Sequence, residues 1–223
     1  MNNHILAPRP GAVIFDLDGT LLDTEPLYSI ASQRVLDPYG NIYTPELKKR
    51  AMGGSSTTSA QIVIDEYDLP LSAKAYLALR EEHLLALFAD ISEISGAGDF
   101  VSAVQTSTVP LGLATSSHAD MCALKLDGLP WASAFDVSIC GDHSSLQRSK
   151  PAPDIFLLCA ERLNINPSDC IAFEDSPNGI EAAKSAGMKV CALMSPYVTR
   201  EDLVDADLIF SDYAELLDYT SLW

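Results

Sequence analysis

Basic residues are scarce in this chain. Its 223 residues include 14 lysines and arginines against 31 aspartates and glutamates, which gives a formal net charge of −17 at pH 7. Nucleic acids and anionic membrane surfaces are bound through basic faces, so this balance argues against both as partners. No hydrophobic run approaches the length that crosses a bilayer, and residues 1–10 contain prolines where a signal peptide has an apolar stretch. We therefore expect a cytoplasmic protein that binds neither nucleic acid nor membrane.

Cysteine and histidine patterns that bind metals are also missing. The five cysteines are an odd number without a CxxC pair, and the four histidines show no metal-ligand spacing. Most of the cysteines lie in apolar surroundings, so we expect buried, reduced thiols. His118 follows the segment LATSS and could border a pocket, but we expect a surface residue at a helix start. The sequence thus gives no sign of disulfides or of a zinc site.

Short apolar segments alternate with helical patterns from Gly96 onward. Hydrophobic residues make up 48% of the chain, which suffices for a sizeable core at this length. Alternation of strand and helix is typical of a parallel sheet with both faces covered by helices, so we predict an α/β fold. The predicted strands are Ala12–Asp18, Leu111–Thr115, Asp136–Cys140, Cys170–Phe173, Lys189–Leu193 and Leu208–Phe210.

The stretch between about Thr24 and Ile91 differs from the rest because it has no strand pattern. Residues typical of helix starts recur along it instead, namely Pro26, Thr44-Pro45, Ser55-Ser56 and Ser72. We predict an all-helical domain at residues 24–92. The α/β core would then consist of residues 1–23 and 93–223.

Two carboxylates stand two residues apart where the first predicted strand ends. Asp16 and Asp18 flank Leu17, and in an extended chain residues i and i+2 project to the same side. Like charges this close repel, and chains keep them chiefly when a cation lies between them or one carboxyl holds a proton. The spacing indicates a metal site with a proton donor. The structural alternative is a strand that runs into an Asp-Gly turn, with both acids solvated.

Three later segments also place polar groups beside predicted strands or helices. Thr115 follows the strand LGLA, where its hydroxyl could hold a phosphate oxygen or simply cap the next helix. Lys150 precedes a predicted helix and could aim its ammonium at the same anion, or be an ordinary surface residue. Glu174 and Asp175 end a strand and could supply oxygens to a cation shared with Asp16, and the alternative is that Asp175 or Ser176 caps the next helix. Open α/β sheets bind ligands at the carboxyl ends of their strands, so the segments together favour one site.

The order of these motifs resembles the haloacid dehalogenase superfamily, in particular its Mg²⁺-dependent phosphatases. The match runs through DLDGTLLDTE, LATSS, KPAPDIF and FEDSPNGIEAAKSAGM and covers nearly the whole chain. Within the superfamily the chain is similar to the group that includes pseudouridine-5′-phosphatase, sugar-phosphate phosphatases and β-phosphoglucomutase. The resemblance implies a Rossmann-like core with a helical cap domain inserted after the first strand, and a catalytic cleft between the two.

The resemblance also implies a role for each motif residue. Asp16 would be the nucleophile that forms an aspartyl-phosphate, and Asp18 would protonate the leaving group and then deprotonate water. The remaining phosphoryl oxygens would bind to Thr115, Ser116 and Lys150. The implied cofactor is Mg²⁺, and its implied ligands are Asp16, Asp18 through its backbone carbonyl, Asp175 and Glu174.

The substrate is the least determined part of this prediction. The resemblance assigns specificity to the cap, whose candidate substrate-binding residues include Tyr28, Gly53 and Gly54. A small phosphorylated metabolite is implied, with pseudouridine 5′-phosphate or a sugar phosphate as the narrower expectation. We expect the enzyme to be a monomer.

Three other functions compete with a phosphatase. Dehalogenases of the superfamily lack the residue that is Asp18 here, which argues against dehalogenation. In β-phosphoglucomutases a gating histidine and a phosphate-gripping arginine occupy the places of Tyr28 and Ser56, so the mutase prediction is weaker. A non-catalytic binding protein could share the fold, since fold alone does not fix activity, but the catalytic residues are retained.

Overall fold

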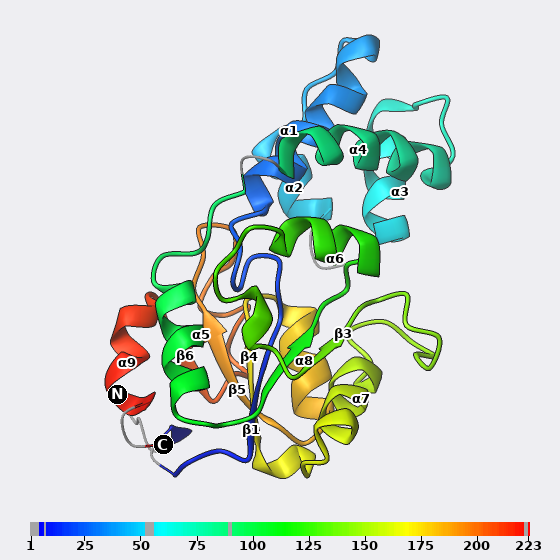
Figure 1. Ribbon diagram of the computed structural model, residues 1–223. Coiled ribbons are helices and arrows are strands. Elements are labelled where there is room, and N and C mark those ends of the chain that lie inside the picture. The colour runs from blue at the N-terminus through cyan, green and yellow to red at the C-terminus, as the bar shows by residue number, and fades with distance from the viewer. Residues whose placement is uncertain (1–4, 7, 52–55, 89–90, 221–222) are drawn as a thin grey trace. The chain divides into compact units, whose positions relative to one another are not determined.

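The computed structural model describes residues 5–6, 8–51, 56–88, 91–220 and 223. The chain divides into two compact units, which are coloured by residue number in Figure 1. The sheet unit consists of residues 1–22 and 93–223, and the helical unit of residues 23–92. Among the described residues, no helix combines the length and apolar composition needed to cross a bilayer.

A parallel β-sheet forms the centre of the sheet unit. Its strands lie in the order β3-β2-β1-β4-β5-β6, and each neighbouring pair is parallel. The predicted α/β fold with a parallel sheet is therefore confirmed. Successive strands are added toward one edge from β1 to β3 and toward the other edge from β4 to β6, so the order reverses between β1 and β4. Open α/β sheets bind ligands at this point. The strands are β1 (Ala12–Phe15), β2 (Leu111–Ala114), β3 (Val137–Ile139), β4 (Cys170–Glu174), β5 (Lys189–Leu193) and β6 (Leu208–Phe210).

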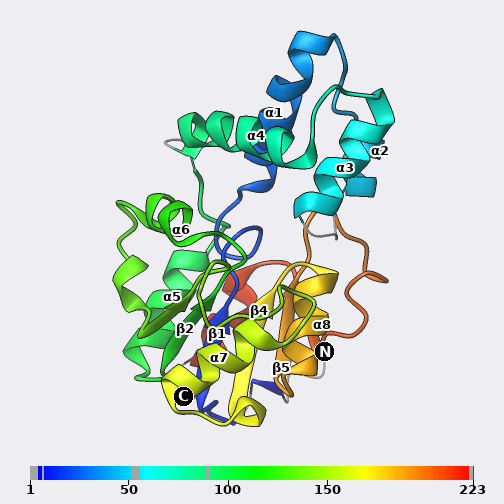
Figure 2. The same ribbon diagram turned by 90° about the vertical axis from the view of Figure 1, so that its right-hand side faces the viewer.

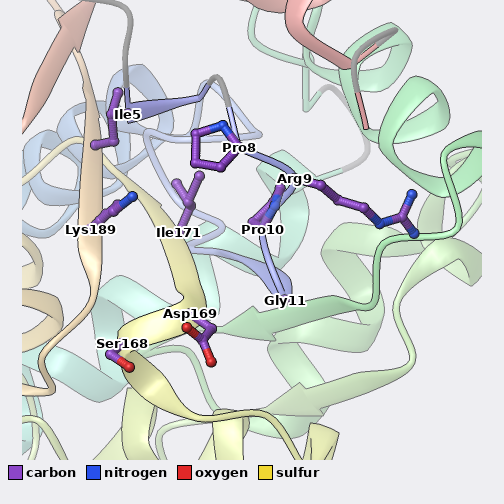
Figure 3. A pocket seen from close by; sticks show the side chains of 9 residues that line it. All are labelled: Ile5, Pro8, Arg9, Pro10, Gly11, Ser168, Asp169, Ile171 and Lys189. Carbon is purple, nitrogen blue, oxygen red and sulfur yellow. The ribbon is translucent and has the colours of Figure 1, made fainter.

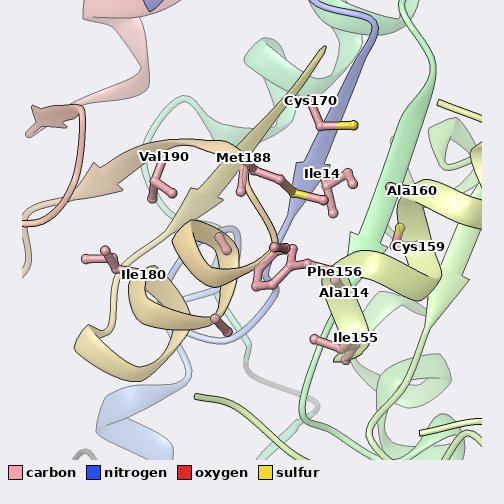
Figure 4. Packing of buried hydrophobic residues seen from close by; sticks show 14 of the residues in the cluster. Ile14, Ala114, Ile155, Phe156, Cys159, Ala160, Cys170, Ile180, Met188 and Val190 are labelled. Carbon is pink, nitrogen blue, oxygen red and sulfur yellow. The ribbon is translucent and has the colours of Figure 1, made fainter. Parts of the chain in front are cut away.

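Helices cover both faces of this sheet, with α5 and α9 on one side and α7 and α8 on the other (Figures 1 and 2). Ile14, Ala172 and Val190 face the second pair, where Phe156 and Ile180 complete a buried cluster (Figure 4). Burial on both faces explains why the central strands β1 and β2 are continuously apolar, whereas β3 at the edge of the sheet carries the exposed Ser138. The helices of this unit are α5 (Ala97–Thr106), α6 (Ala119–Leu126), α7 (Asp154–Leu163), α8 (Pro177–Ser185) and α9 (Leu217–Thr220).

Aromatic side chains fill the opposite face of the sheet. The rings of Phe15 and Phe173, on neighbouring strands, stack with centroids 4.8 Å apart. Phe100 of α5 lies 5.2 Å from the Phe173 ring and 5.2 Å from that of Tyr213. The hydroxyl of buried Tyr213 donates to the backbone oxygen of Thr20, at 3.1 Å. This contact fixes the loop that follows β1, which carries the conspicuous aspartates.

The first strand is shorter than predicted. It ends at Phe15, because the chain turns back at once and the N–H groups of Leu21 and Leu22 both donate to the carbonyl of Leu17. Asp16 and Asp18 therefore lie in a loop, and their side chains have different partners. The prediction that the two side chains project to the same side of an extended strand therefore does not apply to this loop.

The helical unit has its own core and contains no strand among its described residues. Ser72 caps α4 by accepting the N–H of Ala75 at 3.2 Å, and Pro26 lies in the first turn of α1, as predicted. The elements are α1 (Glu25–Leu36), α2 (Pro45–Ala51), α3 (Ser56–Tyr67) and α4 (Ala73–Leu87), with a 3-10 turn at Asp37–Tyr39. Their buried core comprises Val35, Leu36, Leu47, Ala51, Ala60, Val63, Ile64, Leu69 and Tyr76.

All five cysteines are free thiols, as predicted. Cys122, Cys159, Cys170 and Cys191 are buried, and Cys140 is partly exposed. Burial raises the pKa of Cys170 to about 11, so this thiol stays protonated at neutral pH.

Candidate active site

Three carboxylates converge at the carboxyl ends of β1 and β4. Asp16 directly follows β1, and its N–H donates to the backbone oxygen of Phe173 on β4. Since the two strands are parallel neighbours, Glu174 and Asp175 emerge at the same edge. Each of the three residues offers an oxygen, and these oxygens lie within 4.8 Å of one another. Such a set of oxygen donors suits a hard divalent cation.

Lys150 contacts residues at the carboxyl ends of three strands, β1, β2 and β4. Its ammonium lies 2.6 Å from Oδ1 of Asp16, 2.6 Å from Oε1 of Glu174 and 3.0 Å from the backbone oxygen of Ala114. The side chain is only 7% exposed, and the ammonium lies 4.9 Å from the ring centre of Phe156. The alternative of an ordinary surface lysine is wrong, because this one is buried among the acids.

Burial and charge shift the pKa values of this pair. The pKa of Asp16 is raised from 3.8 to about 7, mainly by burial and in smaller part by the carboxylates of Glu174 and Asp18, while Lys150 opposes the shift. Burial alone would lower the pKa of Lys150, but Asp16 and Glu174 hold it above its ordinary value. Lys150 is therefore charged at neutral pH, whereas ionised Asp16 needs compensating positive charge nearby.

Glu174 is held on both of its oxygens. Oε2 accepts the N–H groups of Asp175 and Ser176, at 3.1 and 3.3 Å, while Oε1 contacts Lys150. The side chain passes so close to Gly179 of α8 that a Cβ there would lie 1.9 Å from its carboxyl group. Gly179 in the segment EDSPNG is thus required for the position of Glu174, and through it for that of Lys150.

Asp175 faces the loop after β1. Its Oδ1 accepts the hydroxyl of Thr20 at 3.0 Å, and a Cβ on Gly19 would lie 2.2 Å from its Oδ2. Gly19 also has φ of +83°, a conformation that costs glycine little. Of the two predicted capping candidates, Ser176 and not Asp175 caps α8, by accepting the N–H of Gly179. The capping alternative for Asp175 is therefore wrong, and its carboxylate lies with the acids.

Asp18 has separate partners that the sequence did not point to. The hydroxyl of Ser117 donates to Oδ2 at 2.8 Å, and the ammonium of Lys125 lies 2.5 Å from Oδ1. Lys125 belongs to the buried face of α6, beside Met121 and Cys122. The one sequence signal for this contact is a lysine at helical spacing among apolar residues, and that pattern does not by itself indicate a partner for Asp18.

The remaining predicted phosphate-binding residues follow β2. Thr115 is buried, and its hydroxyl oxygen accepts the N–H of Ser117 at 3.1 Å. It does not cap α6, whose N-cap is the exposed residue His118. Ser116 is exposed beside it. Both residues thus lie at the strand edge where Asp16 and Lys150 meet.

The predicted cap residues belong to the helical unit. Tyr28 lies on α1, with the guanidinium of Arg80 positioned 5.4 Å from its ring centre. Gly53 and Gly54 lie outside the described residues. The substrate-binding role of all three stays a prediction.

A hollow of about 370 Å³ opens at the other end of the sheet (Figure 3). Its walls include Gly11, Asp169 and Lys189, which precede or begin their strands. Arg9 reaches away from it, because its guanidinium donates to the backbone oxygen of Ser107 at 2.9 Å. None of the predicted site residues lines this hollow, so its position does not favour it as a reaction site.

Comparison with known proteins connects this geometry to a family. Residues 13–193 match the family model described as haloacid dehalogenase-like hydrolase. The matched region runs from the first strand to the end of the fifth, and therefore includes every carboxylate and lysine described above.

Individual relatives match over most of their length. A Drosophila melanogaster protein named "Probable pseudouridine-5'-phosphatase" is 38% identical over 91% of this chain and 89% of its own. A phosphorylated carbohydrates phosphatase of Thermotoga maritima is 37% identical over 80% of this chain and 82% of its own. The crystal structure of CbbY from Rhodobacter sphaeroides in complex with phosphate is 27% identical, with a TM-score of 0.81 over 93% of this chain and 96% of its own.

Proposed function

The chain belongs to the haloacid dehalogenase-like hydrolases, and from that premise we propose that it is a Mg²⁺-dependent phosphomonoesterase acting through an aspartyl-phosphate. The observation that carries the proposal is the buried cluster in which Lys150 contacts Asp16 and Glu174, with Asp175 alongside. Neighbouring buried carboxylates repel one another unless positive charge lies between them. In this cluster the Lys150 ammonium supplies one positive charge, and the carboxylate oxygens could bind a metal ion as the second.

The residues present fit Mg²⁺. Three carboxylate oxygens lie within 4.8 Å of one another, and glycine at position 19 leaves the space that the Asp175 carboxylate occupies. Asp16 and Asp175 would hold the ion with the backbone carbonyl of Asp18, and Glu174 lies in the same group of oxygens. Bound there, Mg²⁺ would reduce the repulsion between an anionic nucleophile and an anionic phosphate.

The chain's own residues account for both halves of the reaction. A carboxylate oxygen of Asp16 attacks phosphorus, and the bond from phosphorus to the ester oxygen breaks as Asp18 gives that oxygen a proton. Asp18 then takes a proton from water, which attacks phosphorus and releases inorganic phosphate from Asp16. Lys150 and the hydroxyl of Thr115 bind phosphoryl oxygens where charge accumulates.

The proposed substrate class follows from the relatives. We propose a small phosphorylated metabolite, with pseudouridine 5′-phosphate and sugar phosphates as the first to test, since relatives at 37–38% identity carry those names. Transfer to water, not to a second position of the sugar, is favoured because Tyr28 and Ser56 stand where a mutase needs histidine and arginine.

The test compares the wild-type protein with Asp16→Asn on a panel of phosphorylated metabolites and on p-nitrophenyl phosphate. We expect Mg²⁺-dependent release of phosphate by the wild type and a loss of about a thousandfold or more in the variant, because an amide cannot form the acyl-phosphate. Asp205→Asn, an exposed aspartate of the same unit, is the matched control and should keep full activity. Near wild-type turnover by Asp16→Asn would show the nucleophile to be wrong.

The same panel separates phosphatase from mutase. With β-glucose 1-phosphate, a trace of the 1,6-bisphosphate and Mg²⁺, we expect free phosphate to form. Accumulation of glucose 6-phosphate over many turnovers, with little phosphate released, would overturn the phosphatase and leave the core assignments in place.

A further inference from the structure

Lys125 occupies a place where an apolar residue is expected. It lies on the buried face of α6 with Met121 and Cys122, and its side chain is 0% exposed. A buried ammonium destabilises a fold unless it is paired and hydrogen-bonded. The partners of Lys125 therefore indicate its role.

Those partners belong to the reaction site and not to the hydrophobic core. The ammonium of Lys125 lies 2.5 Å from Oδ1 of Asp18 and 2.8 Å from the hydroxyl oxygen of Ser117. The same hydroxyl donates to Oδ2 of Asp18 at 2.8 Å. Both carboxyl oxygens of Asp18 are thus engaged, and the three side chains form a closed ring of contacts.

The ring fixes the direction of the Asp18 carboxyl group. Its side chain is 21% exposed, so it can be reached from solvent, but rotation of the carboxyl about its last bond would break contacts on both oxygens. Proton transfer requires the donor to lie within hydrogen-bond reach of the ester oxygen, in the right orientation. A carboxyl held on both sides keeps that orientation, whereas a rotating one loses it.

The two buried lysines serve different aspartates. Lys150 contacts Asp16 and Glu174, while Lys125 contacts Asp18 and the serine beside it. We propose that Lys125, acting together with Ser117, is a positioning residue for proton transfer by Asp18. This inference rests on the proposed function, in which Asp18 protonates the leaving oxygen.

Leaving groups that differ in their need for a proton provide the test. Phenyl phosphate needs its leaving oxygen protonated, whereas 2,4-dinitrophenyl phosphate releases a stable phenolate without help. For Lys125→Met we expect kcat/KM on phenyl phosphate to fall on the order of 100-fold, and that on the dinitrophenyl ester by no more than about threefold. Ser117→Ala should show the same asymmetry to a smaller extent, and Lys125→Arg should recover part of the loss.

The control is Lys184→Met, which breaks an ion pair of 2.8 Å with Asp207 in which the side chains are 37% and 34% exposed. It should leave both rates unchanged. Equal losses on the two esters in Lys125→Met and Ser117→Ala, or no loss, would overturn the inference and give Lys125 a purely structural role. If Lys125→Met does not fold, Ser117→Ala is the test: a larger loss on phenyl phosphate than on the dinitrophenyl ester supports the inference, and equal losses or no loss overturn it. A wild-type protein inactive on both esters would instead contradict the proposed function, and this inference with it.

Discussion

At the residue scale, Asp16 combines a reactive role with a cost to folding. Burial raises its pKa from 3.8 to about 7, so the folded protein holds a proton at this carboxyl more tightly than the unfolded chain does. The stability that this group contributes is therefore full below pH 4 and is lost as the pH rises toward 7. Nucleophiles buried in this way are often kept at the expense of stability.

The first prediction follows for the metal-free protein. In the presence of a chelator, Asp16→Asn should become more stable than the wild type as the pH rises from 4 to 8, by a few kcal/mol in the free energy of unfolding. Urea unfolding at several pH values measures this difference, and adding Mg²⁺ should restore stability to the wild type alone. Asp205→Asn should show no such trend. A difference between Asp16→Asn and wild type that stays constant with pH would contradict the raised pKa.

At the element scale, the position of Glu174 depends on one glycine in helix α8. Gly179→Ala would place a Cβ 1.9 Å from the Glu174 carboxyl group. Moving Glu174 removes a partner of Lys150, so we predict a loss of about 2 kcal/mol in stability together with a loss in kcat/KM of tenfold or so.

The matched control is Gly187, which lies just beyond the C-terminal end of the same helix. Gly187 has φ of +84° and open space where a Cβ would lie, so Gly187→Ala should cost about 1 kcal/mol without changing kcat/KM. Melting curves and steady-state rates measured for both variants separate the two effects. Full activity in a folded Gly179→Ala protein would show that Glu174 does not matter to the reaction.

The strands illustrate what the sequence can predict at this scale. All six predicted strands overlap observed ones, because each is a short, mainly apolar segment between helical patterns. The end of β1 was predicted three residues too late, because the backbone turn at Leu17 is formed by hydrogen bonds that no apolar pattern encodes. Acids after a strand were visible in the sequence, and the structure brings Asp16, Glu174 and Asp175 together.

The partners of Asp18 could not be predicted in the same way. Lys125 lies 107 positions away, and its contact depends on which face of α6 packs inward. That packing is a tertiary property, and a single helical period does not determine it. Lys150, by contrast, stood in a recognisable motif, so its place beside the acids was expected.

At the scale of the whole molecule, a net charge of −17 opposes the approach of an anionic substrate. The buried lysines are close to acids and add little to the field far from the protein. We predict that kcat/KM for a phosphate monoester rises by about twofold to fivefold as NaCl increases from about 10 to 150 mM, because salt screens this repulsion. Steady-state rates at constant Mg²⁺ activity test it, and a steep fall would indicate an attractive field at the site. Monomeric state and cytoplasmic location stay predictions.

The central claim is that Asp16 becomes phosphorylated and Asp18 later activates water. The most direct measurement uses Asp18→Asn with 2,4-dinitrophenyl phosphate, whose leaving group needs no proton, so that only the second half of the reaction is slowed. Stopped-flow absorbance should show a burst of about one dinitrophenolate per enzyme followed by slow turnover, and mass spectrometry of the quenched protein should place a phosphoryl group on the peptide that contains Asp16. Slow, steady release with no burst and no phosphorylated peptide would contradict the account.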